Sequence, residues 1–282
     1  MGTINSSAKG LAPLDPLSLA GLRERMRLAT DMSSAVNWLR GLGYSDRAIL
    51  AGFEAVRPRG DAFSQGVENP PLLRRAPPNL RKVETGRLTL YLLDDFMSAD
   101  ECPRLISLVS NHLSPSETTY VIQDKEHRTS TTAYLCHMAH PLAMQIDDKI
   151  CRTLGIRAEY GEGTQAQRYD VGQQFKAHWD CFEPNTVVYQ RMAGVRGNRT
   201  WTFMVYLNDG MEGGATRFTE IDYAVQPKRG MALFWNNLMP DGSPNEATKH
   251  AGEPVISGHK VIITKWFRAV GDGPLFHSAP AV

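Results

Sequence analysis

Apolar residues recur at helical spacing in the first part of the chain. One set runs from Leu17 to Leu28 after Asp15-Pro16, a pair typical of a helix start. A second set runs from Val36 to Leu42 and stops at Gly43, and a third begins at Ser45 and stops before Pro58. The pattern predicts three short amphipathic helices in an N-terminal helical extension over residues 1–57, which form a small bundle or pack onto the main domain.

The periodicity is lost between residues 58 and 82. This stretch holds five of the chain's prolines together with glycine, asparagine and aspartate. Such a composition is typical of a connection that forms no regular element. We therefore expect a linker over 58–82 and a separate catalytic domain over 83–282.

Beyond the linker, short apolar runs alternate with glycine-rich turns. Helices are expected after the Ser98–Glu101 segment and over 141–154, whereas residues 183–198 are expected to form a loop. Helices followed by many short strands favour an α+β fold with an antiparallel sandwich or barrel. The expected strands lie at 87–92, 159–169, 200–207, 223–226, 231–235 and 260–267.

Composition and charge narrow the function classes. The 282 residues are 42% hydrophobic and 22% charged, so a disordered chain is excluded. The formal charge of +1 provides no field for nucleic acid or a membrane surface, and no apolar run is long enough to cross a bilayer. The first residues lack a secretory pattern, and the four cysteines show no CxxC spacing. A cytoplasmic location is expected, and the oligomeric state is left open.

The segment His178-Trp179-Asp180 carries candidate metal chemistry. In an extended chain, residues two apart face the same side, so an imidazole and a carboxylate converge. With His250 as a third ligand, two histidines and one carboxylate would leave one side of a metal open, as non-haem Fe(II) oxygen chemistry requires. A structural zinc site is the less suitable alternative, because such sites are closed by four ligands.

A lysine follows His250 by ten residues and begins an apolar strand. Lys260 leads into Val261-Ile262-Ile263, where an ammonium group is costly to bury unless it has a partner. A small dianion bound beside the metal would supply that partner.

Several further motifs occur in order between Val83 and Ala269. Together with the His–Asp–His set, they resemble the prolyl 4-hydroxylase branch of the 2-oxoglutarate/Fe(II)-dependent dioxygenases. The matching segments are Arg128-Thr129-Ser130, Tyr169, Arg199–Leu207, Gly213–Phe218, Pro227–Trp235, Pro254-Val255, Gly258, Lys260 and Trp266.

The resemblance implies a fold, a reaction and a set of site residues. The fold would be a double-stranded β-helix, or jelly roll, buttressed by helices. The reaction would use Fe(II) on His178, Asp180 and His250, consume 2-oxoglutarate and O2, release succinate and CO2, and rely on ascorbate as reductant. Lys260 would pair with the distal carboxylate of 2-oxoglutarate, with hydrogen bonds to the same end from Tyr169 and Thr202. The cosubstrate-binding residues would be Tyr169, Thr202, Lys260 and Trp266.

The substrate is left as two alternatives, both proline-like. We favour a free cyclic amino acid such as proline or pipecolate, whose carboxylate Arg128 or Arg191 would clamp. The alternative is a prolyl residue in a peptide or protein, and a non-catalytic binding module on the same scaffold is more remote. Tryptophans 179, 201, 235 and 266 are expected to fill the core, and Trp235 is also a candidate substrate contact.

Overall fold

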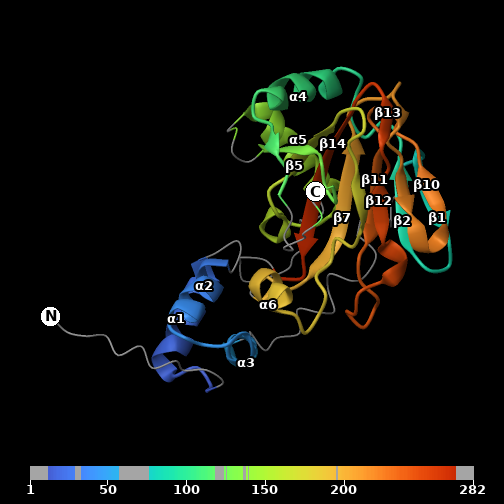
Figure 1. Cartoon of the computed structure of the whole chain (residues 1–282). Helices are drawn as coiled ribbons and strands as arrows, with labels where there is room; N and C mark the ends of the chain where they lie inside the picture. Colours follow the sequence, from blue (N-terminus) through green and yellow to red (C-terminus); the bar gives the residue numbers. More distant parts are fainter. Residues whose placement is uncertain are drawn as a thin grey trace. The chain divides into compact units, whose positions relative to one another are not determined.

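A computed structural model describes residues 12–28, 33–56, 76–117, 124, 126–135, 138, 140–194 and 196–270 (Figure 1). These residues form two compact units. One contains the described residues up to 56 together with Phe182–Asn198, and the other contains 76–181 and 199–270. In the described part of the chain, no helix has the length and apolar character needed to span a membrane.

The first unit is helical. Buried apolar side chains from the three predicted helices form its core, with Leu22, Leu39 and Ile49 fully buried. The predicted start of the third helix at Ser45 is confirmed, because the Ser45 hydroxyl accepts a hydrogen bond from the Ala48 N–H (3.3 Å). The helices of this unit are α1 (Pro16–Leu28), α2 (Ser33–Gly41), α3 (Asp46–Val56) and α6 (Val187–Ala193).

Helix α6 lies where a loop was expected. Thr186 caps it by accepting a hydrogen bond from the Tyr189 N–H (3.0 Å), and Val187 packs against the core of α1–α3. The prediction of a loop over 183–198 is therefore wrong in its central part. The segment needs the N-terminal helices as a packing partner, and a single sequence does not reveal such a distant pairing.

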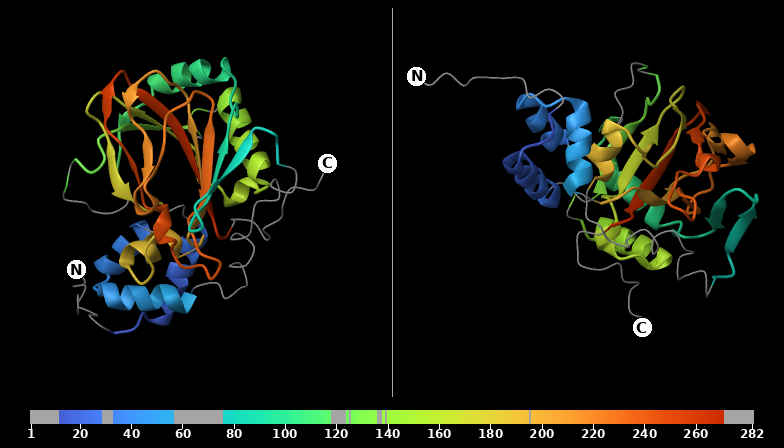
Figure 2. Two further views of the ribbon diagram at one scale, coloured as in Figure 1. Left: turned by 90° about the vertical axis from the view of Figure 1, so that its right-hand side faces the viewer. Right: turned by 90° about the horizontal axis from the view of Figure 1, so that it is seen from below.

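The second unit is built on antiparallel sheets (Figure 2). The large sheet has the strand order β1-β2-β11-β7-β14-β5-β4-β3, the smaller one has the order β10-β9-β12-β6, and β13 pairs with β8. The predicted jelly-roll fold is confirmed. The strands of the large sheet are β1 (Leu80–Glu84), β2 (Thr89–Leu93), β3 (Ser114–Pro115), β4 (Thr131–Tyr134), β5 (Gln165–Tyr169), β7 (Arg199–Tyr206), β11 (Ala232–Asn236) and β14 (Lys260–Arg268). The other strands are β6 (Phe175–His178), β8 (Glu212–Gly213), β9 (Thr216–Phe218), β10 (Tyr223–Val225), β12 (His250–Gly252) and β13 (Val255–Ser257).

The central strands β7, β11 and β14 of the large sheet are buried on both faces, so they read as largely apolar runs. One face packs on helices α4 (Glu101–Ser110) and α5 (Pro141–Leu154) through side chains such as Phe203 and Ile263. The opposite face, with Met204 and Ile262, packs toward the smaller sheet. This second layer encloses the pocket described below.

Two details qualify the predicted domain boundaries. Residues 80–82, assigned to the linker, already belong to strand β1, and the linker residues 58–75 lie outside the described part of the chain.

The predicted helix over 141–154 coincides with α5, which His140 caps at its start by accepting a hydrogen bond from the Leu142 N–H. The predicted helix after Ser98 is α4, where Ser98 and Glu101 exchange hydrogen bonds in a capping box.

Candidate active site

Two neighbouring strands of the smaller sheet, β12 and β6, bring the three predicted metal ligands together. In the antiparallel pairing of β12 with β6, His250 lies directly opposite His178, and Asp180 follows β6 by two residues. The Nε2 atoms of His178 and His250 each lie 3.8 Å from a carboxylate oxygen of Asp180. One ligand atom from each residue falls within 4.8 Å of the others, close enough to share one ion.

Both imidazoles are oriented by the backbone. The Nδ1 of His178 lies 2.8 Å from the Lys176 carbonyl, and the Nδ1 of His250 lies 2.9 Å from the Thr248 carbonyl. A proton on each Nδ1 would satisfy these carbonyls and leave Nε2 with its lone pair toward the common point. The ring of Phe175 also stacks on His178 at 3.6 Å.

The protonation states suit metal binding. Burial and the neighbouring His250 lower the pKa of His178 to about 3, so its imidazole is neutral near pH 7. Burial alone would raise the pKa of Asp180, but the nearby His250, His178 and Arg199 outweigh it, and the pKa is lowered. Two imidazoles and a carboxylate facing one side are the donor set of a non-haem Fe(II) centre, so these residues fit the implied iron.

Thr202 contacts Asp180 and not the cosubstrate end predicted for it. Its hydroxyl donates to Oδ2 of Asp180 (2.7 Å) and accepts from the Asn237 side-chain amide (2.9 Å). Thr202 pairs with Trp266, six residues along β14 from Lys260. At ~3.3 Å per residue this is about 20 Å, so one carboxylate cannot contact both side chains.

Lys260 is a buried cation. Its side chain is only 1% exposed, its Nζ donates to the Gly214 carbonyl (2.9 Å), and it lies 4.4 Å above the ring of Tyr169. Among the described residues no carboxylate lies within ion-pair distance of Nζ, and burial lowers the Lys260 pKa to about 8. Gly213 allows the carbonyl-presenting turn, because a side chain there would clash with the Pro254 carbonyl at a φ of +75°.

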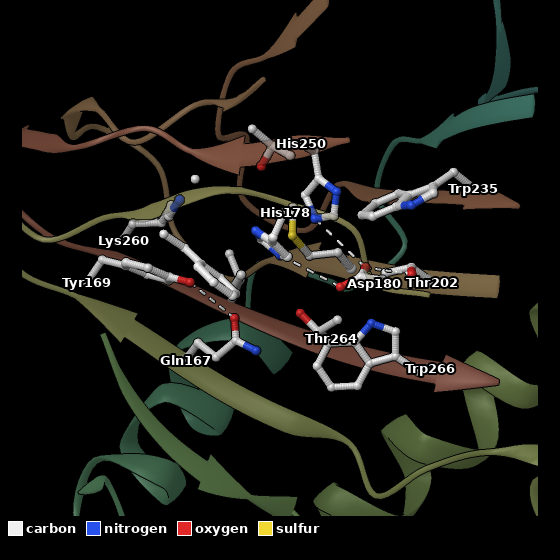
Figure 3. Close-up of a pocket in the computed structure, with 15 residues that line it drawn as sticks. Gln167, Tyr169, His178, Asp180, Thr202, Trp235, His250, Lys260, Thr264 and Trp266 are labelled. Atoms are coloured by element: carbon white, nitrogen blue, oxygen red, sulfur yellow. Dashed lines mark hydrogen bonds and ion pairs between the residues drawn. The ribbon is translucent and has the colours of Figure 1, made fainter. Parts of the chain in front are cut away.

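The pocket between the sheets contains both the candidate metal centre and Lys260 (Figure 3). Four alternate residues of β14 face into it, as the period of a strand requires. The pocket has an empty volume of about 400 Å3, including space open to solvent. Its lining residues are Gln167, Tyr169, Phe175, His178, Asp180, Thr202, Met204, Thr216, Trp235, His250, Gly252, Lys260, Ile262, Thr264 and Trp266.

The far end of the pocket from Lys260 is aromatic. Trp235 and Trp266 flank Thr202 on the neighbouring strands, each in register with it. Both indoles are buried, and within the described part of the chain neither Nε1–H has a hydrogen-bond partner. We call Trp235 and Trp266 the tryptophan end of the pocket. Two buried donors without partners are suited to acceptors on a ligand.

The other predicted residues have different positions. Arg128 is occupied, because its guanidinium donates to Ser130, Thr132 and the Glu117 carbonyl. Arg191 lies on α6 in the helical unit, and its role as a carboxylate clamp stays a prediction. Trp179 does not fill the core as predicted: it is 37% exposed, because it points away from the two candidate ligands on either side of it.

Sequence reasoning missed several lining residues. Thr264 and Ile262 could have been found by counting in steps of two from Lys260 toward Trp266. Gln167 follows in the same way from Tyr169, which pairs with Lys260 across β5 and β14. Phe175 and Met204 carry no comparable signal, because an aromatic or apolar residue on a strand is most simply a core residue.

Comparison with known proteins assigns this unit. The sequence profile of the 2OG-Fe(II) oxygenase superfamily matches residues 164–268, which include all three candidate ligands and Lys260. This chain contains a 2OG-Fe(II) oxygenase domain. The family is named for Fe(II) and 2-oxoglutarate, the metal and the cosubstrate that the resemblance implied for these residues.

Curated relatives that match this chain include prolyl 4-hydroxylase subunits. Prolyl 4-hydroxylase subunit alpha-1 of Gallus gallus is 32% identical over 181 residues, which are 63% of this chain and 35% of that protein. The Homo sapiens subunit is 33% identical over 150 residues, 53% of this chain and 28% of that protein. The chain thus spans about a third of the length of these curated relatives.

A solved structure gives the same result for the fold. The viral collagen prolyl hydroxylase of Paramecium Bursaria Chlorella virus-1, in complex with 2OG, superposes with a TM-score of 0.50 at 26% identity. The match covers 64% of this chain and 96% of the viral protein. The viral enzyme therefore corresponds to the oxygenase domain and not to the whole chain.

Proposed function

We propose that this chain hydroxylates proline residues within a polypeptide, using Fe(II), 2-oxoglutarate and O2. In this proposal His178, Asp180 and His250 hold the iron, and Lys260 binds the distal carboxylate of 2-oxoglutarate. The main observation behind this proposal is that the two ends of the pocket differ. The buried ammonium group of Lys260 lies on one side of the candidate metal centre, and the tryptophan end, with its uncharged N–H donors, lies on the other.

The Lys260 end favours a dianionic cosubstrate. A buried ammonium with no carboxylate partner among the described residues is destabilising until an anion binds beside it. 2-Oxoglutarate carries one carboxylate for this ammonium and a second, with its keto group, for the metal. The face of the Tyr169 ring stabilises the ammonium group through a cation–π contact.

The tryptophan end favours peptidyl proline over a free amino acid. A free amino acid would bring a carboxylate that needs a cation on burial, and among the described residues that line the pocket Lys260 is the one lysine or arginine. Arg128, the predicted clamp, commits three of its N–H groups to Ser130, Thr132 and the Glu117 carbonyl and is not among the lining residues of the pocket. A prolyl residue brings an apolar ring, which the two indoles can contact, and amide carbonyls, to which the indole N–H groups can donate.

The protein's own groups account for binding, orientation and the exclusion of water. When bound, Fe(II) supplies the O2 chemistry by which one oxygen atom enters the substrate C–H bond and the other enters succinate, with loss of CO2. Thr202 and Asn237 hold the Asp180 carboxylate, and the backbone carbonyls hold both imidazoles. The two indoles keep the reacting end apolar, which limits access of bulk water.

The pKa of Lys260 predicts how 2-oxoglutarate affinity changes with pH. The ammonium form is the binding form, and its pKa of about 8 in the ligand-free protein means that charge is lost as the pH rises. We expect the dissociation constant to be constant below about pH 7 and to rise by about tenfold per unit above about pH 8. Titration of the Mn(II)-loaded protein by calorimetry measures this. Lys260→Arg is the control, because a guanidinium stays charged and its affinity should not change with pH.

An unchanged wild-type affinity between about pH 7 and about pH 9.5 would contradict this assignment of Lys260. Parallel pH profiles in the wild type and Lys260→Arg would point to a different titrating group.

The names of the relatives agree with the proposed substrate. The curated relatives are named as prolyl 4-hydroxylase subunits and the viral structure as a collagen prolyl hydroxylase. The preference for a free cyclic amino acid, predicted from the sequence, stays untested.

Direct competition tests the proposal. The protein with Fe(II), ascorbate and 2-oxoglutarate is given a proline-containing peptide with blocked termini together with free L-proline and L-pipecolate. We expect the peptide to gain one oxygen atom, with a kcat/KM at least about tenfold above either amino acid. The same peptide with alanine in place of proline is the control. Preferred hydroxylation of a free amino acid, or equal hydroxylation of the alanine peptide, would overturn the proposal.

A further inference from the structure

A buried ionic cluster lies behind the tryptophan end of the pocket. The carboxylate of Glu162 accepts two hydrogen bonds from Arg199 (2.7 and 2.8 Å) and one from Arg268 (2.5 Å). Burial alone would raise the pKa of Glu162, but the two arginines outweigh it and the pKa is strongly lowered. Lys265 extends the cluster by donating to the Glu162 carbonyl (2.8 Å) and to Asp147 (2.7 Å). Glu162 is thus a charged, fully paired group within the oxygenase domain.

Arg199 connects this cluster to both halves of the reacting centre. The nitrogens Nε and NH2 hold Glu162 in a two-point pair, and NH1 donates to the backbone carbonyl of Asp180 (3.3 Å). The flat face of the same guanidinium lies 4.0 Å from the ring of Trp266. One planar group therefore contacts a candidate iron ligand along its edge and the substrate-side indole across its face.

Glu162 also acts on Trp266 through the backbone. Its N–H donates to the Trp266 carbonyl (2.8 Å), so both ends of the Arg199–Trp266 stack rest on the same residue. Because a two-point pair fixes the plane of a guanidinium, Glu162 determines how Arg199 faces the indole and how its remaining nitrogen points at Asp180.

We propose that the Arg199–Glu162 pair is a positioning device that holds Asp180 and Trp266 in one mutual arrangement. A substrate that moves the Trp266 indole would then also shift Asp180. Conversely, a metal ion bound to Asp180 would fix the orientation of the indole. The identity of that substrate rests on the proposed function, whereas the link between Asp180 and Trp266 does not.

Arg268 provides a matched control. It is as deeply buried, at 1% exposure, and shares the same Glu162 carboxylate, so Arg268→Lys makes the same chemical change in the same cluster. The contacts to the Asp180 carbonyl and the Trp266 ring are those of Arg199. A cluster with a merely structural role would respond alike to both substitutions.

The test compares Arg199→Lys with Arg268→Lys in the full-length chain. Lysine keeps the charge but has neither the two-point geometry nor the flat face. We expect Arg199→Lys to weaken Co(II) binding by about tenfold, because loss of a group that supports a metal ligand typically has an effect of this size. The visible absorption of bound Co(II) measures this affinity. The KM of Arg199→Lys for the proline peptide should rise by about tenfold, and the variant should consume more 2-oxoglutarate per hydroxylated peptide than the wild type.

Arg268→Lys is expected to keep Co(II) affinity within about twofold of the wild type, even if its melting temperature falls. Equal losses of Co(II) affinity in the two variants, or an unchanged affinity in Arg199→Lys, would overturn the proposal. If Arg199→Lys does not fold, Glu162→Gln replaces it, because a neutral amide no longer fixes the guanidinium plane and the same losses are expected. The Co(II) measurement needs no substrate, so it separates failure of this proposal from failure of the proposed function.

Discussion

Replacement of His178, Asp180 or His250 by alanine is expected to abolish turnover of 2-oxoglutarate. Each substitution removes one of the three protein groups that converge within 4.8 Å, and water can refill the position but not reproduce its charge and direction. Loss of groups that merely support a ligand already costs about 10–100-fold, so loss of a ligand should exceed about a hundredfold in kcat/KM. Succinate release and Co(II) absorption measure the two consequences separately.

His112→Ala is the control for these variants. His112 is an exposed histidine after α4, so its removal tests the loss of an imidazole away from the pocket. It should keep wild-type succinate release and Co(II) absorption. Wild-type turnover in any one of the three ligand variants would show that the metal is held by other residues.

The candidate metal centre was predictable because its main signal is local. His178 and Asp180 are two residues apart, and their convergence needs only an extended backbone. His250 lies 72 positions after His178, so no local pattern links the two, and the resemblance to a family strengthened its place in the set. The structure supplies the physical reason: β12 and β6 are paired in a register that puts the two histidines opposite each other.

The role of Thr202 could not be predicted from its position in a motif. Its contact with Asp180 depends on the register of β7 against β14 and β11, which is set by many apolar pairs along three strands. The same holds for Arg199, whose partner Glu162 comes from a segment 37 residues earlier. Long-range pairing of this kind leaves no periodic signal in the chain.

The helical unit shows the limit of domain prediction. Its three N-terminal helices were predictable, because each has its own apolar period and terminal residues. The sequence did not predict that Phe182–Asn198 belongs to the same unit, since strands β1 to β5 lie between this segment and the three helices along the chain. Asn198 closes the segment at its ends, accepting from the Phe182 N–H (2.7 Å) and donating to the Phe182 carbonyl (2.9 Å). The predicted cytoplasmic location and the use of ascorbate stay predictions.

Lys260→Met is expected to raise the dissociation constant of 2-oxoglutarate by about a hundredfold or more. Methionine keeps the length of the side chain but leaves the distal carboxylate in a buried site without its counter-ion, the kind of unpaired charge that costs about 3–5 kcal/mol. In the ligand-free protein the substitution should instead stabilise the fold, because there the buried ammonium group is itself the charge without a partner. We therefore expect the variant without ligand to melt at the wild-type temperature or above.

The ligand can be changed in the same way as the protein. 2-Oxopentanoate has a methyl group where 2-oxoglutarate has its distal carboxylate, so the wild type should bind it about a hundredfold more weakly. In Lys260→Met this difference should fall to within about threefold, which a cycle of four calorimetric titrations on the Mn(II)-loaded protein would measure. Lys176→Met serves as control, because the Lys176 side chain is partly exposed, at 38%, and pairs with Asp124 at 2.8 Å. A preference for 2-oxoglutarate that survives in Lys260→Met would place the carboxylate contact on another residue, since the cycle subtracts any general damage to the pocket from the interaction between the two charges.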